Sequence, residues 1–326
     1  MADNSIAFVF PGQGSQKVGM LAAAHGRFAA VRDAFTEASD ALGYDMWHLV
    51  QNGEQEALNL TETTQPVLLT SSVALWRAWQ ASGGARPGIM AGHSLGEFSA
   101  LVCAGSLAFS DAVRLVRQRG EFMQSAVPVG EGAMAAIIGL DDDVINATCA
   151  DVTARGKGVV AAVNFNSPGQ VVIAGQTAAV DGAIEALKAA GAKRAMPLPV
   201  SAPFHTALMK PAGERLAEAI AGVTIEPPDI PVVHNVHART ESDPERIRTL
   251  LVEQIYSPVQ WTACVETIAR QGFSSIVECG PGKVLSGLNR RIDKSLQSFS
   301  LEEPDALDAA LQALGAPDDD PEENSP

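Results

Sequence analysis

The sequence predicts an α/β protein in which a parallel sheet is covered by helices and interrupted by a small inserted domain. Near both ends of the chain, short apolar runs bounded by glycine or proline alternate with stretches of helical periodicity. The middle of the chain instead follows the order β-α-β-β-α-β. With 326 residues, of which 46% are hydrophobic and 19% charged, the chain is long enough to bury a sizeable core.

The N-terminal part supplies the first two strands. The apolar run Ile6–Phe10 ends at a Pro-Gly pair, which is typical of a buried strand that enters a loop. Helical patterning follows to about residue 42 and returns over residues 65–81. Residues 87–92 predict a second buried strand, and a helix is expected directly after Ser94. Strands that alternate with helices in this way favour a parallel sheet.

The middle of the chain predicts a separate small unit. Its expected elements, in chain order, are a strand at 133–140, a helix at 141–154, strands at 159–164 and 170–174, a helix at 177–190 and a strand at 193–198. The two central strands are joined through Asn166-Ser-Pro-Gly169, which is a strong turn signal. This order is that of a ferredoxin-like split unit. We therefore expect an inserted domain at 129–199 and a discontinuous main domain made of 1–128 and 200–300.

The C-terminal part returns to alternating helices and strands and then becomes acidic. Strands are expected near 231–236 and 274–279. From Leu301 on, helical patterning fades, so residues 301–326 are expected to form a frayed, solvated acidic tail. Nine acidic residues and no Lys or Arg follow Leu301, so they account for nine of the 15 net negative charges of the chain.

Composition excludes several classes of function. The balance of 23 basic against 38 acidic residues argues against nucleic acid or an anionic membrane surface as the main partner. No signal-peptide pattern is visible, and no apolar run approaches the roughly 20 residues of a membrane-spanning helix. The four cysteines show no CxxC spacing and the six histidines show no metal-binding spacing. We expect a cytoplasmic protein with structural thiols and no metal.

Ser94 is the candidate nucleophile. Gly92-His-Ser94-Leu-Gly96 matches the pattern G-x-S-x-G, whose glycines allow a strand to turn sharply into a helix with the serine at the apex. The motif lies between a predicted strand and a predicted helix, as this chemistry requires, and the helix offers free N–H groups to a developing oxyanion. A tight turn without catalytic function is the alternative.

A nucleophilic serine needs a base, and His205 is the preferred candidate. It lies in a loop that leads into a helix, just after the small domain returns the chain to the large one. His93 adjoins the serine on a sharp turn and is a poor base, whereas His234 and His237 remain possible. No single Asp or Glu stands out as the third member of a catalytic triad with Ser94 and the histidine. A backbone carbonyl or an Asn or Gln side chain could orient the imidazole instead.

Arg119 falls on the buried face of a predicted helix. The apolar stripe over residues 112–126 runs through position 119, whereas Arg117 should face water. A guanidinium keeps its proton, so its burial demands an anionic partner. That partner is either an internal Asp or Glu or the carboxylate of a ligand held by a bidentate fork.

Two glycine-rich loops follow strands. Residues 11–16 match neither a dinucleotide fingerprint nor a phosphate-binding P-loop, because Lys17 occupies the last glycine position and no GKS/T follows. Such a loop can still bring backbone N–H groups close to a ligand, with a plain tight turn as the alternative. The loop over residues 278–283 is similar, and we expect it to be structural.

The ordered set of motifs resembles a known enzyme family, the malonyl-CoA:acyl carrier protein transacylases of bacterial fatty-acid synthesis. The resemblance covers about residues 5–300. Its motifs, in order, are FPGQGSQ at 10–16, TETTQP at 61–66, GHSLGE at 92–97, RG at 119–120, NFNSPGQVVIAG at 164–175, the His205 loop, YSPVQW at 256–261 and GPGK at 280–283. The resemblance implies an α/β-hydrolase-like domain with a ferredoxin-like insertion.

The resemblance also implies a ping-pong mechanism and its residues. Ser94 would attack the malonyl thioester, His205 would take its proton, and the main-chain carbonyl of Gln254 would orient His205. The backbone N–H groups of Gln13 and Leu95 would hold the oxyanion. By the same resemblance Arg119 would grip the malonyl carboxylate, and Phe204 is the residue found in malonyl-selective relatives. No cofactor is implied, since the CoA thioester and the carrier phosphopantetheine are substrates.

Three alternatives to a fatty-acid transacylase are left open. A serine hydrolase or thioesterase would share the turn at Ser94 but needs no buried arginine, and a non-catalytic carrier-binding protein would need neither Ser94 nor His205. A transacylase could also serve a polyketide carrier. The expected partners are malonyl-CoA and an acyl carrier protein, and the family is commonly monomeric.

A basic stretch offers a possible docking surface for the acidic carrier protein. It consists of Lys283, Arg290, Arg291 and Lys294, opposed only by Asp293. An ordinary solvated helix face is the alternative interpretation.

Overall fold

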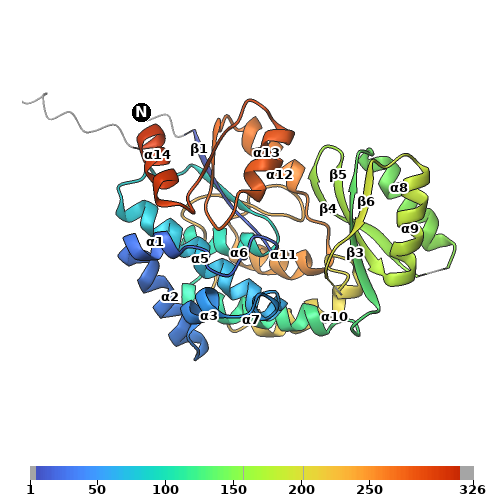
Figure 1. Cartoon of the computed structure of the whole chain (residues 1–326), viewed down its shortest axis with the longest axis horizontal. Helices are drawn as coiled ribbons and strands as arrows, with labels where there is room; N and C mark the ends of the chain where they lie inside the picture. The colour runs from blue at the N-terminus through green and yellow to red at the C-terminus, as the bar shows by residue number, and fades with distance from the viewer. Residues whose placement is uncertain (1–4, 157, 201, 316–326) are drawn as a thin grey trace, which may run out of the picture.

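The computed structural model describes residues 5–156, 158–200 and 202–315. It contains two sheets, each with its own helices (Figure 1). A five-stranded parallel sheet forms the larger unit, and a four-stranded antiparallel sheet with two helices lies at one end of the molecule. The α/β fold class with a parallel sheet and an inserted ferredoxin-like unit is confirmed.

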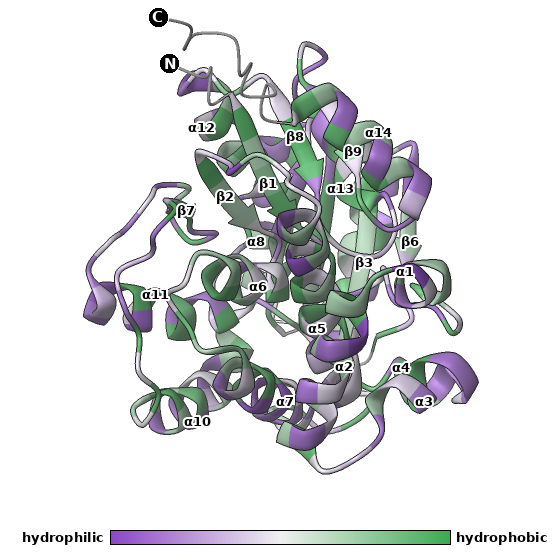
Figure 2. Ribbon diagram, turned by 90° about the vertical axis from the view of Figure 1, so that its left-hand side faces the viewer, coloured by the Kyte–Doolittle hydropathy of each residue, from purple (hydrophilic) through white to green (hydrophobic). Residues whose placement is uncertain are grey.

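The strands of the parallel sheet are short, and β1 and β2 at its centre are apolar throughout. Figure 2 shows β1, β2 and β8 as mainly hydrophobic ribbons that run side by side. In spatial order they are β7 (Val232–Val233), β2 (Ile89–Gly92), β1 (Ile6–Phe10), β8 (Ser275–Glu278) and β9 (Gln297–Ser300). β1 pairs on both sides, with Ala7 opposite Ile89 of β2 and opposite Ile276 of β8. Continuous apolar strands are expected in such a sheet because helices cover both of its faces.

The two faces of the sheet belong to two apolar clusters. Ile6, Phe8 and Phe10 join the larger one, and the intervening Ala7 and Val9 join the smaller one, as the two-residue period of a strand requires. The helices of this unit, in chain order, are α1 (Ala22–Arg27), α2 (Ala29–Leu42), α3 (Met46–Asn52), α4 (Gln55–Leu58), α5 (Thr61–Ala81), α6 (Leu95–Cys103), α7 (Phe109–Ser125), the 3₁₀ turn η1 (Ala207–Met209), α10 (Lys210–Ile220), α11 (Pro244–Tyr256), α12 (Trp261–Arg270), α13 (Val284–Ile292) and α14 (Pro304–Leu314).

The helix α5 is central to the larger cluster. It is buried along nearly its whole length, and its residues pack against α2, α6 and α7. α12 and α13 cover the opposite face, with Trp261 and Leu285 among their buried side chains. The carboxyl ends of β1, β2 and β8 therefore lie between the two layers of helices. Parallel sheets carry their ligand sites at this edge.

The antiparallel unit has the element order that the sequence predicts. Its elements are β3 (Gly132–Ile138), α8 (Asp142–Ala154), β4 (Val160–Ser167), β5 (Gln170–Gln176), α9 (Thr177–Ala189) and β6 (Arg194–Pro197). The strand order is β4-β5-β3-β6, and the β4–β5 hairpin turns at Pro168 and Gly169, where Gly169 has φ 72°. α8 and α9 cover one face, while Met134 and Val172 on the other face join the large core cluster.

Backbone hydrogen bonds connect the two units beside the chain crossing. The N–H of Phe165 donates to the carbonyl of Val259 at 3.0 Å, and the N–H of Val259 donates to the carbonyl of Val163 at 2.8 Å. Thr262 adds a side-chain hydrogen bond to the carbonyl of Phe165. β4 is thereby fixed to the segment that joins α11 to α12.

The prediction of a frayed tail from Leu301 was wrong for residues 301–314. Leu301 and Leu307 are fully buried, and α14 packs against the body of the protein. Asp308 forms a bidentate ion pair with Arg27, and Glu302 accepts a hydrogen bond from the backbone of Gly282. The acidic charge of this segment hid an amphipathic helix. The rest of the predicted tail, residues 316–326, lies outside the described residues.

Two further findings concern the setting of the chain. Within the described ranges, no helix is both long and apolar enough to cross a membrane. The four cysteines are free thiols, and all four are buried.

Candidate active site

Ser94 lies at a strained turn between β2 and α6. Its backbone has φ 51° and ψ −108°, a conformation that L residues rarely adopt. The flanking glycines are required by close backbone contacts: a Cβ on Gly92 would lie 1.9 Å from the carbonyl of Gly96, and one on Gly96 would lie 2.0 Å from the carbonyl of Phe10. The sequence therefore forces the serine out at the apex of the turn.

His205 is the histidine that meets the serine hydroxyl. Its Nε2 lies 2.9 Å from Oγ of Ser94, and its Nδ1 lies 2.8 Å from the main-chain oxygen of Gln254. Since a carbonyl can only accept, Nδ1 carries the proton and Nε2 is free to accept one. His205 also has a positive φ, of 62°, in the loop before η1.

The protonation of His205 is set by its surroundings. Burial and, secondarily, the nearby Arg119 cation lower the pKa of His205 to about 3. The imidazole is therefore neutral at physiological pH, as a general base must be.

Arg119 is fully buried on α7 and reaches the same serine. Its guanidinium donates to three uncharged oxygens: Oε1 of Gln65 at 2.9 Å, Oε1 of Gln254 at 2.8 Å and Oγ of Ser94 at 3.2 Å. Its Nε has no hydrogen-bond partner among the described residues. Burial lowers the pKa of Arg119 to about 10, so the group remains a cation. In the part of the chain that the structure describes, its fork is held by two amide oxygens and the serine hydroxyl, and by no carboxylate.

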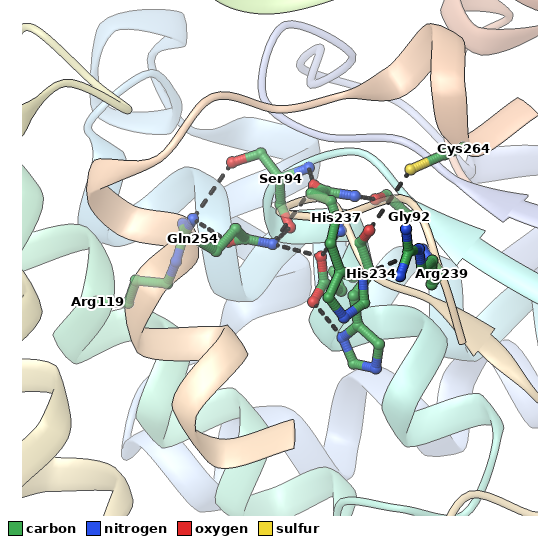
Figure 3. A network of polar contacts seen from close by, with 10 residues as sticks. Gly92, Ser94, Arg119, His234, His237, Arg239, Gln254 and Cys264 are labelled. Atoms are coloured by element: carbon green, nitrogen blue, oxygen red, sulfur yellow. Dashed lines mark hydrogen bonds and ion pairs between the residues drawn. The ribbon is translucent and has the colours of Figure 1, made fainter. Parts of the chain in front are cut away.

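A close helix contact brings Arg119 to this place. A Cβ on the next residue, Gly120, would lie 2.6 Å from the carbonyl of Thr61, so only glycine lets α7 approach the start of α5 this closely. That approach places Gln65 within reach of the guanidinium. Figure 3 shows Arg119, Gln254 and Ser94 meeting in one polar network.

Two polar residues of this network were not singled out from the sequence. Glu97, one turn after the nucleophile on α6, is fully buried and bonds His234, the backbone of Asn235 and the side chain of Gln254. Gln65 is a second such residue. Both lie inside the motifs TETTQP and GHSLGE, which were the signals that could have identified them.

The other histidines have different partners. His234 bonds Glu97 through Nδ1, and Nδ1 of His237 accepts from the backbone N–H of Arg239. Nε2 of His93 lies 2.8 Å from Oδ1 of Asn166 on the small unit. Among the described histidines, His205 is the one whose ring contacts Ser94.

Gln13 and Leu95 border the turn at Ser94 from two sides. Leu95 begins α6, where backbone N–H groups lack intrahelical acceptors. Gln13 follows β1 in a loop that packs on the turn: a Cβ on Gly12 would lie 2.6 Å from the carbonyl of His93. The N–H of His93 in turn donates to the carbonyl of Phe10 at 3.0 Å.

The predicted basic stretch is exposed at and around α13. Lys283 precedes the helix, Arg290 and Arg291 lie in its last turn, and Lys294 follows it. The guanidinium of Arg291 donates to Gln170 of the small unit, whereas the carboxylate of Asp293 accepts from Ser295 in a local turn. The structure thus brings three of the four cations to one helix end.

Comparisons with known proteins agree with this geometry. Residues 7–305 match the acyl transferase domain family. The chain is 60% identical over 305 residues to the malonyl CoA-acyl carrier protein transacylase of Salmonella typhimurium, covering 94% of this chain and 98% of that protein.

Two solved structures are also similar to this chain. An acyl carrier protein S-malonyltransferase from Vibrio cholerae has 55% identity and a TM-score of 0.91, covering 94% of this chain and 99% of that one. A malonyl-transacylase solved in complex with a type II polyketide synthase acyl-carrier protein has 54% identity and a TM-score of 0.93, with the same coverage. With the buried arginine and the serine–histidine pair in place, the chain belongs to the acyl transferase family, among the malonyl-CoA:acyl carrier protein transacylases.

Proposed function

We propose that the enzyme transfers the malonyl group from malonyl-CoA to the phosphopantetheine thiol of an acyl carrier protein, through a malonyl ester on Ser94. One observation carries the assignment of the site. The hydroxyl of Ser94 lies between a neutral base, His205, and a buried cation, Arg119, whose fork is occupied by no carboxylate of the described part of the chain. A nucleophile beside a cation that has only uncharged partners suits an acyl group that carries its own carboxylate.

In the first half-reaction, Nε2 of His205 takes the proton of Ser94, and Oγ attacks the thioester carbonyl. The N–H groups of Gln13 and Leu95 would hold the resulting oxyanion. As the tetrahedral intermediate collapses, the C–S bond breaks and His205 returns the proton to the CoA thiolate. The carbonyl of Gln254 keeps the proton-bearing Nδ1 turned away from the serine throughout.

The second half-reaction repeats these steps in reverse with a new thiol. His205 takes the proton of the phosphopantetheine thiol, and the thiolate attacks the ester carbonyl of malonyl-Ser94. Collapse of this intermediate breaks the C–O bond, and the proton on His205 returns to Oγ. Protons balance over both halves, and the proposed chemistry draws on no cofactor beyond the two thiol substrates.

Arg119 gives the proposal its specificity. A malonyl carboxylate would form a charge-assisted bidentate pair with a guanidinium that the protein holds only through amide and hydroxyl oxygens. Acetyl-CoA lacks that carboxylate and would leave the buried cation with uncharged partners. A serine hydrolase has no need of such a group, so Arg119 favours the transferase over the hydrolase alternative.

The carrier protein that accepts the malonyl group has two candidates. A fatty-acid carrier follows from the named relatives, and a polyketide carrier is favoured by the similar transacylase solved with such a partner. We propose Lys283, Arg290, Arg291 and Lys294 as the docking surface for either, because carrier proteins of this pathway are acidic. We also propose that the enzyme acts as a monomer in the cytoplasm, where its four free thiols would remain reduced.

One incubation tests the proposed function. The enzyme is mixed with malonyl-CoA and holo acyl carrier protein, and the products are followed by mass spectrometry. We expect malonyl carrier protein to form faster than free malonate. Malonate as the main product would identify a hydrolase, and the absence of both products would identify a binding protein. A fatty-acid and a polyketide carrier, compared at equal concentration, would rank the two acceptors.

A further inference from the structure

Glu97 is a buried charge that the proposed mechanism does not use. It lies on α6 and is fully buried, yet both of its oxygens are engaged. Oε1 accepts from Nδ1 of His234 at 2.7 Å, and Oε2 accepts from the N–H of Asn235 at 2.9 Å and from Nε2 of Gln254 at 2.8 Å. Burying a carboxylate is costly, so this arrangement calls for a reason beyond packing.

The contacts of Glu97 determine which way the Gln254 amide faces. Nε2 of Gln254 donates to Glu97 and also to the carbonyl of Ser94 at 3.0 Å, while Oε1 accepts from Arg119 at 2.8 Å. A flipped amide would turn its NH₂ group toward the guanidinium and its oxygen toward the carboxylate, so both contacts would be lost. The carboxylate thus holds Oε1 of Gln254 against Arg119.

We propose that Glu97 is a positioning residue that sets the preference for malonyl over acetyl groups, acting on Arg119 through the side chain of Gln254. The proposal deepens the proposed function and rests on the role of Arg119 in it. Glu97, Gln254 and Arg119 form an unbroken line of hydrogen bonds from α6 through α11 to α7. Figure 3 shows Gln254 between Arg119 and the side of the network where His234 lies.

The intervening amide explains why a carboxylate can support Arg119 without blocking it. A carboxylate in direct contact would occupy the fork that the substrate needs. Placed one amide away, Glu97 still stabilises the buried cation and partly offsets the lowering of its pKa by burial. The guanidinium is thereby kept charged and aimed, while its strongest partner is left to the substrate.

Glu97 is itself held rigidly, as this role requires. The Oδ1 of Asn235 accepts from the N–H of Ser94 at 2.7 Å, and its Nδ2 donates to the carbonyl of Gly92 at 2.7 Å. The segment after β7 therefore ties the carboxylate to the turn that carries the nucleophile. His234 closes the other side, with its ring fully buried.

The test compares loading of Ser94 by malonyl-CoA and acetyl-CoA in single-turnover mass spectrometry. The variants are Glu97→Gln, Gln254→Met, their double variant and Arg119→Ala. Gln254→Met keeps the main-chain carbonyl that orients His205 and removes the side-chain amide, together with its hydrogen bond to the carbonyl of Ser94. Glu278→Gln is the matched control, because Glu278 is equally buried but its carboxylate accepts hydrogen bonds, among the described residues, from residues 285 and 286 of α13. Thermal unfolding reports whether each variant is folded.

We expect Glu97→Gln and Gln254→Met each to lower the ratio of malonyl to acetyl loading by about tenfold or more, since each weakens hydrogen bonds to charged groups. The double variant should match Gln254→Met, because Glu97 acts through that side chain. Glu278→Gln should leave the ratio unchanged even if it lowers the melting temperature. A merely structural role for Glu97 would instead lower loading by both thioesters equally.

The outcomes separate this proposal from the proposed function. If Arg119→Ala loses the malonyl preference while Glu97→Gln keeps it, the role of Glu97 is refuted and the clamp stands. If Arg119→Ala keeps the preference, the clamp itself is refuted, and this inference with it. Additive losses in the double variant would show that Glu97 does not act through Gln254. If Glu97→Gln does not fold, Gln254→Met decides alone, and an unchanged ratio there overturns the proposal.

Discussion

Two turns at the carboxyl end of the parallel sheet each combine glycines with a buried glutamate, but the two glutamates accept hydrogen bonds from different parts of the chain. After β8, the oxygens of Glu278 accept from the N–H groups of Leu285 and Ser286 and from the hydroxyl of Ser286, all in the first turn of α13. After β2, Glu97 accepts from His234, Asn235 and Gln254, which come from distant parts of the chain.

The difference teaches how to recognise a buried acid of the kind that we propose positions a catalytic site. Residue type and burial are the same in the two turns, and so is the strand-to-helix context. What differs is the origin of the hydrogen-bond donors. An acid that accepts from the helix directly after it caps that helix, as Glu278 does for α13, whereas an acid that accepts from several distant elements fixes those elements relative to one another.

The largest expected effect comes from the serine of each turn. Ser94→Ala should abolish the malonyl-CoA-dependent gain in protein mass and lower transfer by at least about 10⁴-fold, because the nucleophile is lost. Ser286→Ala removes a hydroxyl that only contacts Glu278, so malonyl loading should persist. Both variants are measured by intact-protein mass spectrometry. A remaining mass gain in Ser94→Ala would place the nucleophile elsewhere.

The second largest effect is expected at Arg119, which contacts Ser94 in the turn after β2. Arg119→Ala should lower malonyl loading by about 10²-fold or more and acetyl loading far less, since a substrate carboxylate would lose its only charged partner. The control is Arg117→Ala on the same helix, where the arginine is partly exposed and pairs with Glu121. Rates of Ser94 acylation are the measurement. Equal losses for the two thioesters would contradict the clamp.

A third pair of variants compares the glycines of the two regions. Gly96→Ala would press a Cβ against the Phe10 carbonyl and should lower the free energy of unfolding by about 2–3 kcal/mol. Gly287→Ala in α13 meets open space and should raise that free energy by about 0.5–1 kcal/mol, because alanine favours a helix. Urea denaturation measures both. Similar values at the two positions would show that the β2 turn is not tightly constrained.

The fourth effect concerns the basic residues at the end of α13, which we propose as the docking surface for the carrier protein. Charge reversal of Arg290 and Lys294 should raise the KM for carrier protein about five- to tenfold and leave the KM for malonyl-CoA unchanged. Arg291 is spared because it also contacts Gln170. Reversal of Arg155 and Lys188 on the small unit is the charge-matched control. If the control changes the KM for carrier protein as much as the test variant, docking at α13 is disproved.

The smallest expected effect is a pH dependence of stability from His205. Its pKa is about 3 in the folded protein and near 6.5 when unfolded, so below pH 6.5 the unfolded chain binds a proton that the folded protein does not. Stability from this group is present above pH 6.5 and is lost as the pH falls. Between pH 7.5 and 6 the loss is about 0.8 kcal/mol.

The variant His205→Gln should lack this part of the pH dependence. The free energy of unfolding is measured for both proteins across that range by urea denaturation. Parallel curves would mean that His205 is not held neutral by the fold.

Much of the fold followed from the sequence because short apolar strands bounded by glycine and proline are distinctive. Two residues of the candidate site could also be predicted from the sequence. Ser94 lies in a motif with a required context, and Arg119 interrupts an otherwise apolar helix face. Both signals are local, so they survive without knowledge of tertiary contacts.

What the sequence could not show depends on distance along the chain. Nothing local distinguishes Glu97 from a solvated acid, because its partners lie at least 137 residues away. The choice between His205 and His234 likewise depended on which one the fold brings to Ser94. The acidic segment after Leu301 was misjudged because its anchor, the pair between Asp308 and Arg27, spans 281 residues.

The strand order has a consequence for the newly synthesised chain. β1 is made first, yet its final neighbours are β2 and β8, and β8 ends only at Glu278. A chain still being translated therefore holds its most apolar strand with one edge unpaired until synthesis has reached Glu278. Domains tend to fold as units during synthesis, and the insert, whose strands all lie within Gly132–Pro197, can complete its own sheet long before the body can. The parallel sheet, whose turns carry the candidate active site, is thus the last of the two sheets to be completed.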